Sequence, residues 1–163
     1  MPLAVHAKDT EKIRRIMSDL LVRSESDECF LCDSGGYMVA HEGAERADSS
    51  LISALGAGVF MASRELARML GEQEFNTVFH QGENKNIFIR AVSAEVLLVI
   101  IFSSSGSLGL VKLYSTPAVT ELQGVFEEIK KRHVEVPSAD HRSFVLREDN
   151  IFNLKTVPAA GKA

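Results

Sequence analysis

The spacing of apolar residues predicts that the chain begins with a helix followed by a β-hairpin. Apolar side chains recur every three or four residues over Asp9–Val22, which is typical of an amphipathic helix, and Asp9 or Thr10 is the expected N-cap. Two segments of strand-like composition, Glu28–Asp33 and Tyr37–His41, flank Ser34-Gly35-Gly36. Because glycine adopts the positive φ angles of tight turns, we expect these segments to pair as antiparallel strands.

A second helix and three strands are expected in the middle of the chain. Polar residues that can cap a helix precede the segment Ser50–Leu70, and Gly71 follows it as a stop signal. Strands are predicted over Thr77–Gln81, Ile87–Val92 and Val96–Phe102. The last of them contains no polar residue, so it should be a central strand that is buried on both faces. Short turns join consecutive strands, which makes their pairing antiparallel.

A third helix and a tail complete the predicted order. The helix should run from Leu108 to near His133, with a kink or a break into two helices at Pro117, because proline removes a backbone hydrogen bond. The order helix, strand, strand, helix, three strands, helix predicts an α+β fold in which a five-stranded antiparallel sheet lies between helices. One domain is expected over residues 9–134. A linker and a tail follow over 135–163, where the default state is mobile and a short docking helix could form.

The second predicted helix has two faces of different character. At 100° per residue, one stripe is rich in large aliphatic residues and is the expected core face: Leu51, Leu55, Val59, Ala62, Leu66, Met69 and Leu70. The opposite face combines small, bulky apolar and basic residues: Ser53, Gly56, Ala57, Phe60, Met61, Arg64 and Arg68. Two interpretations of this opposite face stay open: another part of the chain covers it, or it is a partner or dimer surface.

Composition and charge exclude several classes of partner. The chain has 163 residues, of which 45% are hydrophobic, and this suffices for one packed core. A formal net charge of −4 with scattered basic residues argues against a nucleic-acid partner. The N-terminus lacks the pattern of a signal peptide, and no stretch approaches the roughly 18 apolar residues of a membrane-spanning helix. We therefore expect a soluble, cytoplasmic protein.

No constellation of catalytic or metal-binding residues is apparent in the sequence. Cys29 and Cys32 have a CxxC spacing, but residues three apart on a strand point to opposite faces, so both are expected to be buried and reduced. A phosphate-binding loop of the GxxxxGK[ST] type is absent. Among the histidines only His80 is expected inside the fold, and it has no nucleophile or second metal ligand in its own motif. These observations favour a binding protein without cofactor or metal over an enzyme.

Four blocks of sequence resemble the Roadblock/dynein light chain family. In chain order they are Leu70-Gly71-Glu72-Gln73-Glu74-Phe75, Phe79-His80-Gln81-Gly82, Val96-Leu97-Leu98-Val99-Ile100-Ile101-Phe102 and Ser107-Leu108-Gly109-Leu110-Val111-Lys112-Leu113. The similarity runs from about Glu11 to Ile129, and the spacing of the blocks is most similar to the MglB-type members, which are bacterial partners of the small GTPase MglA. The resemblance implies a Roadblock fold, with the second helix on one face of the sheet and the first and third on the other.

The resemblance also implies a function. MglB-type proteins are homodimers in which edge strands can join the two sheets, and two chains bind one MglA-like small GTPase in cell polarity and gliding motility. They activate GTP hydrolysis by reorganising the GTPase switch regions and have no active site of their own. The implied partner contacts on the second helix are Ser53, Ala57, Phe60, Met61, Arg64 and Arg68. The tail would add contacts at Phe144, Ile151, Phe152 and Leu154.

Two alternatives stay open at this point. MglB-type second helices often carry small residues where Met61, Arg64 and Glu65 stand here, so the chain could be a Roadblock scaffold that binds a GTPase or another Roadblock protein without stimulating hydrolysis. A small-molecule sensory domain would need a pocket, and the continuous apolar strand Val96–Phe102 argues for a filled interior instead.

Overall fold

The computed structural model describes residues 5–44 and 47–135, and these contain three helices and five strands. The elements are α1 (Ala7–Ser24), β1 (Glu28–Asp33), β2 (Met38–Gly43), α2 (Ser49–Leu70), β3 (Thr77–His80), β4 (Lys85–Ala91), β5 (Val96–Ser103) and α3 (Leu108–Glu135). This is the predicted order. The chain divides into two compact units, residues 1–130 and 131–163, and the sheet with its covering helices belongs to the first. The tail predictions lie outside the described residues.

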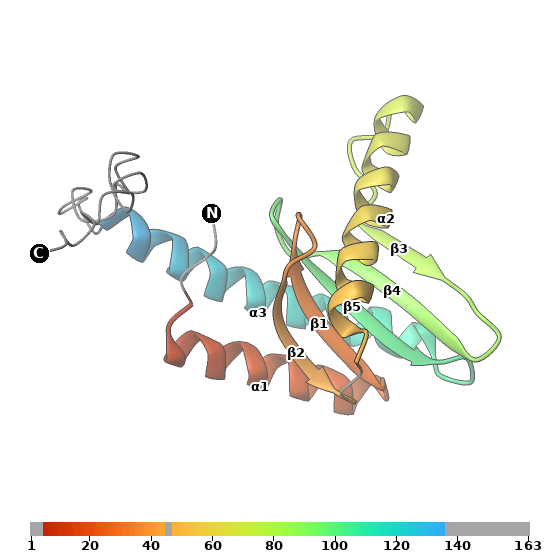
Figure 1. Cartoon of the computed structure of the whole chain (residues 1–163), viewed down its shortest axis with the longest axis horizontal. Coiled ribbons are helices and arrows are strands. Elements are labelled where there is room, and N and C mark those ends of the chain that lie inside the picture. The colour runs from red at the N-terminus through yellow and green to blue at the C-terminus, as the bar shows by residue number, and fades with distance from the viewer. Residues whose placement is uncertain (1–4, 45–46, 136–163) are drawn as a thin grey trace, which may run out of the picture. The chain divides into compact units, whose positions relative to one another are not determined.

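The five strands form one antiparallel sheet in the order β2-β1-β5-β4-β3 (Figure 1). The central strand, β5, pairs with β1 on one side and β4 on the other. Every residue from Val96 to Phe102 is buried, as the unbroken apolar run predicted. The predicted α+β architecture, with α2 on one face of the sheet and α1 and α3 on the other, is therefore confirmed.

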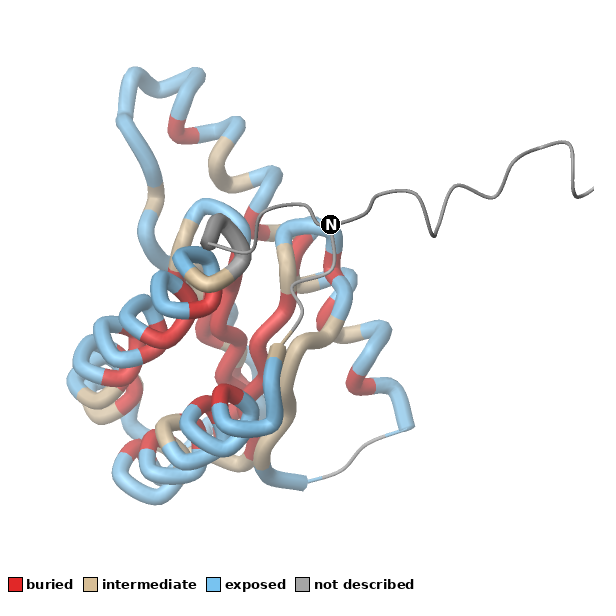
Figure 2. Tube along the Cα trace, turned by 90° about the vertical axis from the view of Figure 1, so that its left-hand side faces the viewer, coloured by how far each residue is buried: buried red, intermediate tan, exposed pale blue. Residues whose placement is uncertain are grey.

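The sheet separates two hydrophobic clusters, and Figure 2 shows the buried residues gathered in the strands and on the inner sides of the helices. Neighbouring residues of β5 contribute to different clusters because side chains alternate along a strand. Leu98 packs with residues of α1 and α3 such as Met17 and Leu122, whereas Val99 packs with residues of α2 such as Phe60. The α2 cluster is the smaller of the two.

The ends of the first two helices follow local capping rules. His6 is the N-cap of α1, so the predicted cap at Asp9 or Thr10 was misplaced by one turn. Asp9 is the third helical residue, and its Oδ2 accepts a hydrogen bond from the amide of His6 at 3.2 Å. Helix α2 ends at Leu70 as predicted, because Gly71 adopts a left-handed φ of 77° that stops the helix.

Helix α3 continues through Pro117 as a single helix, so the predicted break into two helices was wrong. Val111 before the proline and Ala118 and Leu122 after it are buried in the same cluster, while Pro117 itself is exposed. Packing of both halves against one sheet compensates for the single backbone hydrogen bond that proline removes.

The two cysteines are free and lie on opposite faces of β1, as the strand geometry predicted. Cys29 packs between the sheet and α1, where its Sγ–H donates to the carbonyl of Met17 at 3.8 Å. Burial raises the pKa of Cys29, and the nearby carboxylates of Glu42 and Glu28 raise it further. Burial is also the main cause of the raised pKa of Cys32.

We expect both thiols to resist alkylation in the folded protein, because the thiolate is the reactive form and burial disfavours it. Iodoacetamide at neutral pH should label Cys29 and Cys32 at least about 100-fold more slowly in buffer than in guanidinium chloride. Mass spectrometry after timed quenching measures both rates. Fast labelling of Cys29 in buffer would show that it is not enclosed between β1 and α1.

Candidate partner-binding surface

Helix α2 packs on the sheet through small residues and the ring of Phe60. Ser53, Ala57 and Phe60 are 0%, 2% and 4% exposed, and the Ser53 hydroxyl donates to the carbonyl of Gly36 at 3.1 Å. Ala67 continues this buried face toward the C-terminal end of the helix. The core face predicted for this helix was therefore wrong, and the interpretation in which the same chain covers Ser53, Ala57 and Phe60 is the correct one.

Part of the inner face of α2 consists of small residues, because the helix backbone there lies close to the sheet and to the β1–β2 turn. A Cβ added at Gly56 would lie 3.6 Å from a methyl of Val99 and 3.7 Å from Ile89. At the β1–β2 turn, a Cβ added at Gly36 would lie 2.6 Å from the Cα of Ala54, so only glycine fits there. Close to these two glycines the inner face of α2 has room only for small side chains, whereas one turn further along the ring of Phe60 fits against the sheet.

The large aliphatic residues of α2 face away from the chain's own core. We call Leu51, Leu55, Ala62, Leu66, Met69 and Leu70 the outer stripe; all six are exposed. The exposed fractions of Leu51, Leu55 and Leu66 are 61%, 63% and 55%, and those of Met69 and Leu70 are 81% and 72%. Figure 1 shows the C-terminal turns of α2 extending past the sheet. A continuous exposed apolar stripe of this kind marks an interaction surface.

The remaining predicted contact residues lie around the helix from the outer stripe, next to the buried face of α2, and are at least partly exposed. Met61 is 40% exposed. Arg64 is half-buried and its Nη2 donates to Glu74 at 3.3 Å, on the segment that returns from α2 to β3. Arg68 is exposed and pairs with Glu65. Both arginines thus have carboxylate partners within the chain.

The sequence pattern alone did not reveal the outer stripe as an exposed surface, because it predicted these residues to be the core face of the helix. The signal that could have revealed it is the spacing of Ser53, Gly56 and Ala57, because a face of small residues at helical spacing indicates close packing of a helix on its neighbour. The predicted tail contacts, Phe144, Ile151, Phe152 and Leu154, lie outside the described residues.

The sheet is only partly covered on the α2 side. Helix α2 packs mainly on β1, β2 and β5. Beyond it, Val78, Ile87 and Ala91 of β3 and β4 are only partly buried on the same side of the sheet as α2. An uncovered apolar floor therefore lies beside the helix that carries the outer stripe.

The two edges of the sheet differ. On the β2 edge, the register shifts so that Leu31 pairs with Ala40 and Cys32 with Met38, which leaves Val39 as a bulge, and α1 packs against this strand. The β3 edge has an uninterrupted register with β4. Bulges and covering elements protect an edge from pairing, so β3 is the edge that is able to accept another strand.

Other kinds of site have little support in the described part of the chain. Residues 5–44 and 47–132 contain no group of three or more His, Cys, Asp and Glu side chains placed to hold a metal. A groove of about 300 Å³ lies between α1 and α3, on the opposite side of the sheet from α2. In the helices that the structure describes, none is long and apolar enough to cross a membrane.

The Roadblock/LC7 domain family matches residues 17–102, which is more than half of the chain. The chain belongs to this family. The structure of Myxococcus xanthus MglB is 33% identical in sequence to the chain and superimposes with a TM-score of 0.69, covering 72% of this chain and 96% of that one. The chain is thus an MglB-type Roadblock protein.

Two further MglB structures are similar to this MglB-type chain. The gliding protein MglB from Thermus thermophilus is 28% identical, with a TM-score of 0.73 over 77% of this chain and 96% of that one. An MglB described as having a tetrameric arrangement is 27% identical, with a TM-score of 0.74 over 78% of this chain and 96% of that one. These similarities make the chain a Roadblock-type regulatory protein related to the gliding proteins.

Proposed function

We propose that this protein is a homodimer that activates GTP hydrolysis by an MglA-like small GTPase, binding it in a ratio of two chains to one. It acts by reorganising the switch regions of the GTPase, in bacterial polarity or motility and in the cytoplasm, at a cell pole. The observation that carries the proposal is the outer stripe of α2, because its large apolar side chains find no cover within the described residues of one chain.

The sheet suggests how the homodimer forms. A second copy that pairs its β3 antiparallel to β3 of the first would extend the sheet through the unprotected edge. Its α2 would then lie beside the partly buried Val78, Ile87 and Ala91. Two α2 helices side by side would cover the floor that one helix leaves open, and the combined outer stripes would form one apolar surface for the GTPase.

The arginines of α2 support activation without an arginine finger. A finger must reach the transferring phosphoryl group of the GTPase. Arg64 pairs with Glu74 and Arg68 with Glu65, so each arginine already has a carboxylate partner within the chain. We therefore assign them contacts with the GTPase surface, together with Met61.

Replacing Arg64 by Ala should lower stimulated GTP hydrolysis by less than about tenfold, because a surface contact and not a catalytic charge is lost. Arg68→Ala should behave in the same way. Single-turnover hydrolysis at saturating regulator measures both effects. A loss of about 10³-fold from either variant would identify an arginine finger instead.

The test of the proposed function is single-turnover GTP hydrolysis by the MglA-like GTPase of the same organism, with and without an excess of this protein, combined with the mass of the complex. Faster hydrolysis and a mass of two chains plus one GTPase are expected. A complex without faster hydrolysis would contradict activation and establish a scaffold, which the exposed, bulky Met61 on α2 also allows.

The tail forms a second part of this proposal. We assign Phe144, Ile151, Phe152 and Leu154 to an additional GTPase contact, on the basis of their large apolar side chains. Removing residues 136–163 should weaken binding of the GTPase and leave the dimer intact. An unchanged affinity would exclude the tail from the interface.

A further inference from the structure

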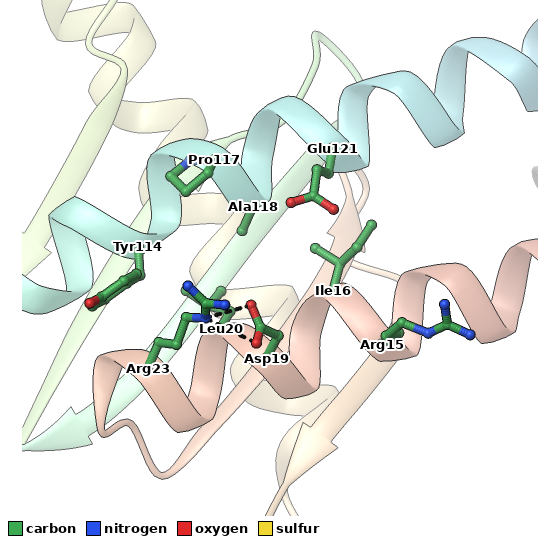
Figure 3. A pocket seen from close by; sticks show the side chains of 9 residues that line it. All are labelled: Arg15, Ile16, Asp19, Leu20, Arg23, Tyr114, Pro117, Ala118 and Glu121. Carbon is green, nitrogen blue, oxygen red and sulfur yellow. Dashed lines mark hydrogen bonds and ion pairs between the residues drawn. The ribbon is translucent and has the colours of Figure 1, made fainter.

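The groove between α1 and α3 is a surface that the proposed GTPase site does not use. Its floor is apolar, with Ile16 and Leu20 from α1 and Ala118 from α3 (Figure 3). Pro117 and Leu113, which are neighbours on α3 at helical spacing, are exposed beside it, and Leu113 is 61% exposed. The groove lies across the sheet from the outer stripe, so the two surfaces can be occupied at the same time.

At one end of the groove, the side chains already have interaction partners within the chain. Arg23 lies 2.9 Å from Asp19 Oδ2, and its guanidinium carbon lies 5.9 Å from the centre of the Tyr114 ring. These contacts close that end and fix the side chains that line it (Figure 3). A charged partner would gain little there.

The other end carries two charges of opposite sign without partners among the described residues. Arg15 belongs to α1 and Glu121 to α3, and neither makes an ion pair in the part of the chain that the structure describes. Figure 3 shows Glu121 across the groove from Ile16, which is the residue next to Arg15. One unpaired cation and one unpaired anion therefore line this part of the groove, one on each helix.

This arrangement is complementary to itself. Consider a two-fold axis that runs parallel to the groove. Rotation about this axis exchanges the two sides of the groove but not its two ends. It would therefore place α1 of one copy against α3 of another copy at the same distance along the groove. Arg15 of each copy would then face Glu121 of the other, and the exposed apolar residues of both copies would meet. A two-fold interface requires this kind of self-complementary surface.

We propose that the α1–α3 groove is a second self-association surface, on which another copy of this chain docks about such an axis with Arg15 opposite Glu121. The 18-residue helix α1 and the part of α3 beside it present a face of roughly 500 Å² per copy, which is the size of weak and transient interfaces. Combined with the dimer proposed above, which uses the other side of the sheet, the groove links dimers into larger assemblies at high concentration.

The test is sedimentation velocity of the full chain from a few micromolar to the highest soluble concentration. We expect the average mass to rise above that of a dimer. Arg15→Glu would place two carboxylates against each other and Glu121→Arg two guanidiniums, so each should raise the concentration needed for the larger species by about tenfold or more. The double variant Arg15→Glu/Glu121→Arg recreates the pairs with exchanged partners and should return this concentration to within about threefold of the wild type.

Glu127→Arg is the matched control, because it makes the same charge change on α3 at a position about 120° around the helix from Glu121. A mass that never exceeds that of a dimer overturns the proposal. It is also overturned if the single variants match Glu127→Arg or if the double variant does not recover. Should Arg15→Glu convert a dimer into a monomer, the groove would be the primary interface, and the β3–α2 dimer, not this inference, would be wrong.

Discussion

Leu55→Glu is expected to lower the affinity for the GTPase at least about 100-fold and to leave the homodimer intact. Leu55 lies in the outer stripe and is 63% exposed in one chain, so the folded monomer should tolerate the change. In the complex, the new carboxylate would be buried against apolar side chains without a partner, which costs several kcal/mol. Calorimetry measures the GTPase affinity, and light scattering measures the mass of the dimer.

Val22→Glu provides the matched control for this variant. Val22 is 76% exposed and belongs to α1, so the same type of substitution is placed on the opposite side of the sheet. It should leave both the dimer and the GTPase affinity unchanged. If Leu55→Glu and a second stripe variant, Leu66→Glu, both bound the GTPase normally, the outer stripe would not be the GTPase interface.

Phe60→Ala should lower the free energy of unfolding by about 3–5 kcal/mol, because the phenyl ring is 4% exposed and its removal leaves a cavity between α2 and the sheet. Urea unfolding followed by circular dichroism measures the loss. All variants should be compared at one protein concentration, since dimerisation contributes to the apparent stability. A charged residue at position 60 would prevent folding and would not report on partner binding.

The adjacent residue separates this result from a general effect of mutating α2. Met61 is 40% exposed, so Met61→Ala should cost less than about 1 kcal/mol of stability while it weakens GTPase binding. If the two variants lost similar stability, the orientation of α2 derived from the burial of Ser53, Ala57 and Phe60 would be incorrect.

Most of the fold could be predicted because it depends on local patterns. The apolar run Val96–Phe102 is central in the sheet, and β1 has the predicted ends, since alternation and turn residues act over a few positions. The proline in α3 was harder to judge. Its local preference for a break was outweighed by packing of Val111, Ala118 and Leu122 against the same cluster, which involves residues far apart in the sequence.

The candidate site was only partly predictable. The sequence identified α2 as the relevant helix and placed Met61, Arg64 and Arg68 on an accessible side of it. It assigned the residues of the outer stripe to the core, because a large aliphatic stripe on a helix is ordinarily buried in its own domain. In this chain, the stripe is left exposed and a face of small residues is buried.

By itself, the sequence determined the order of the elements, the central strand, the opposite orientation of Cys29 and Cys32, and the family, because each depends on residue spacing along the chain. Only the tertiary structure decided which face of α2 turns inward, which sheet edge stays open, and which charges of α1 and α3 lack partners. The periodicity of a helix shows that an apolar stripe will be covered. Whether the chain's own sheet or a second molecule covers it depends on how closely the backbones approach. Here α2 lies close to its neighbours at Gly36 and Gly56, and it buries Ser53, Ala57 and Phe60 in place of the aliphatic stripe.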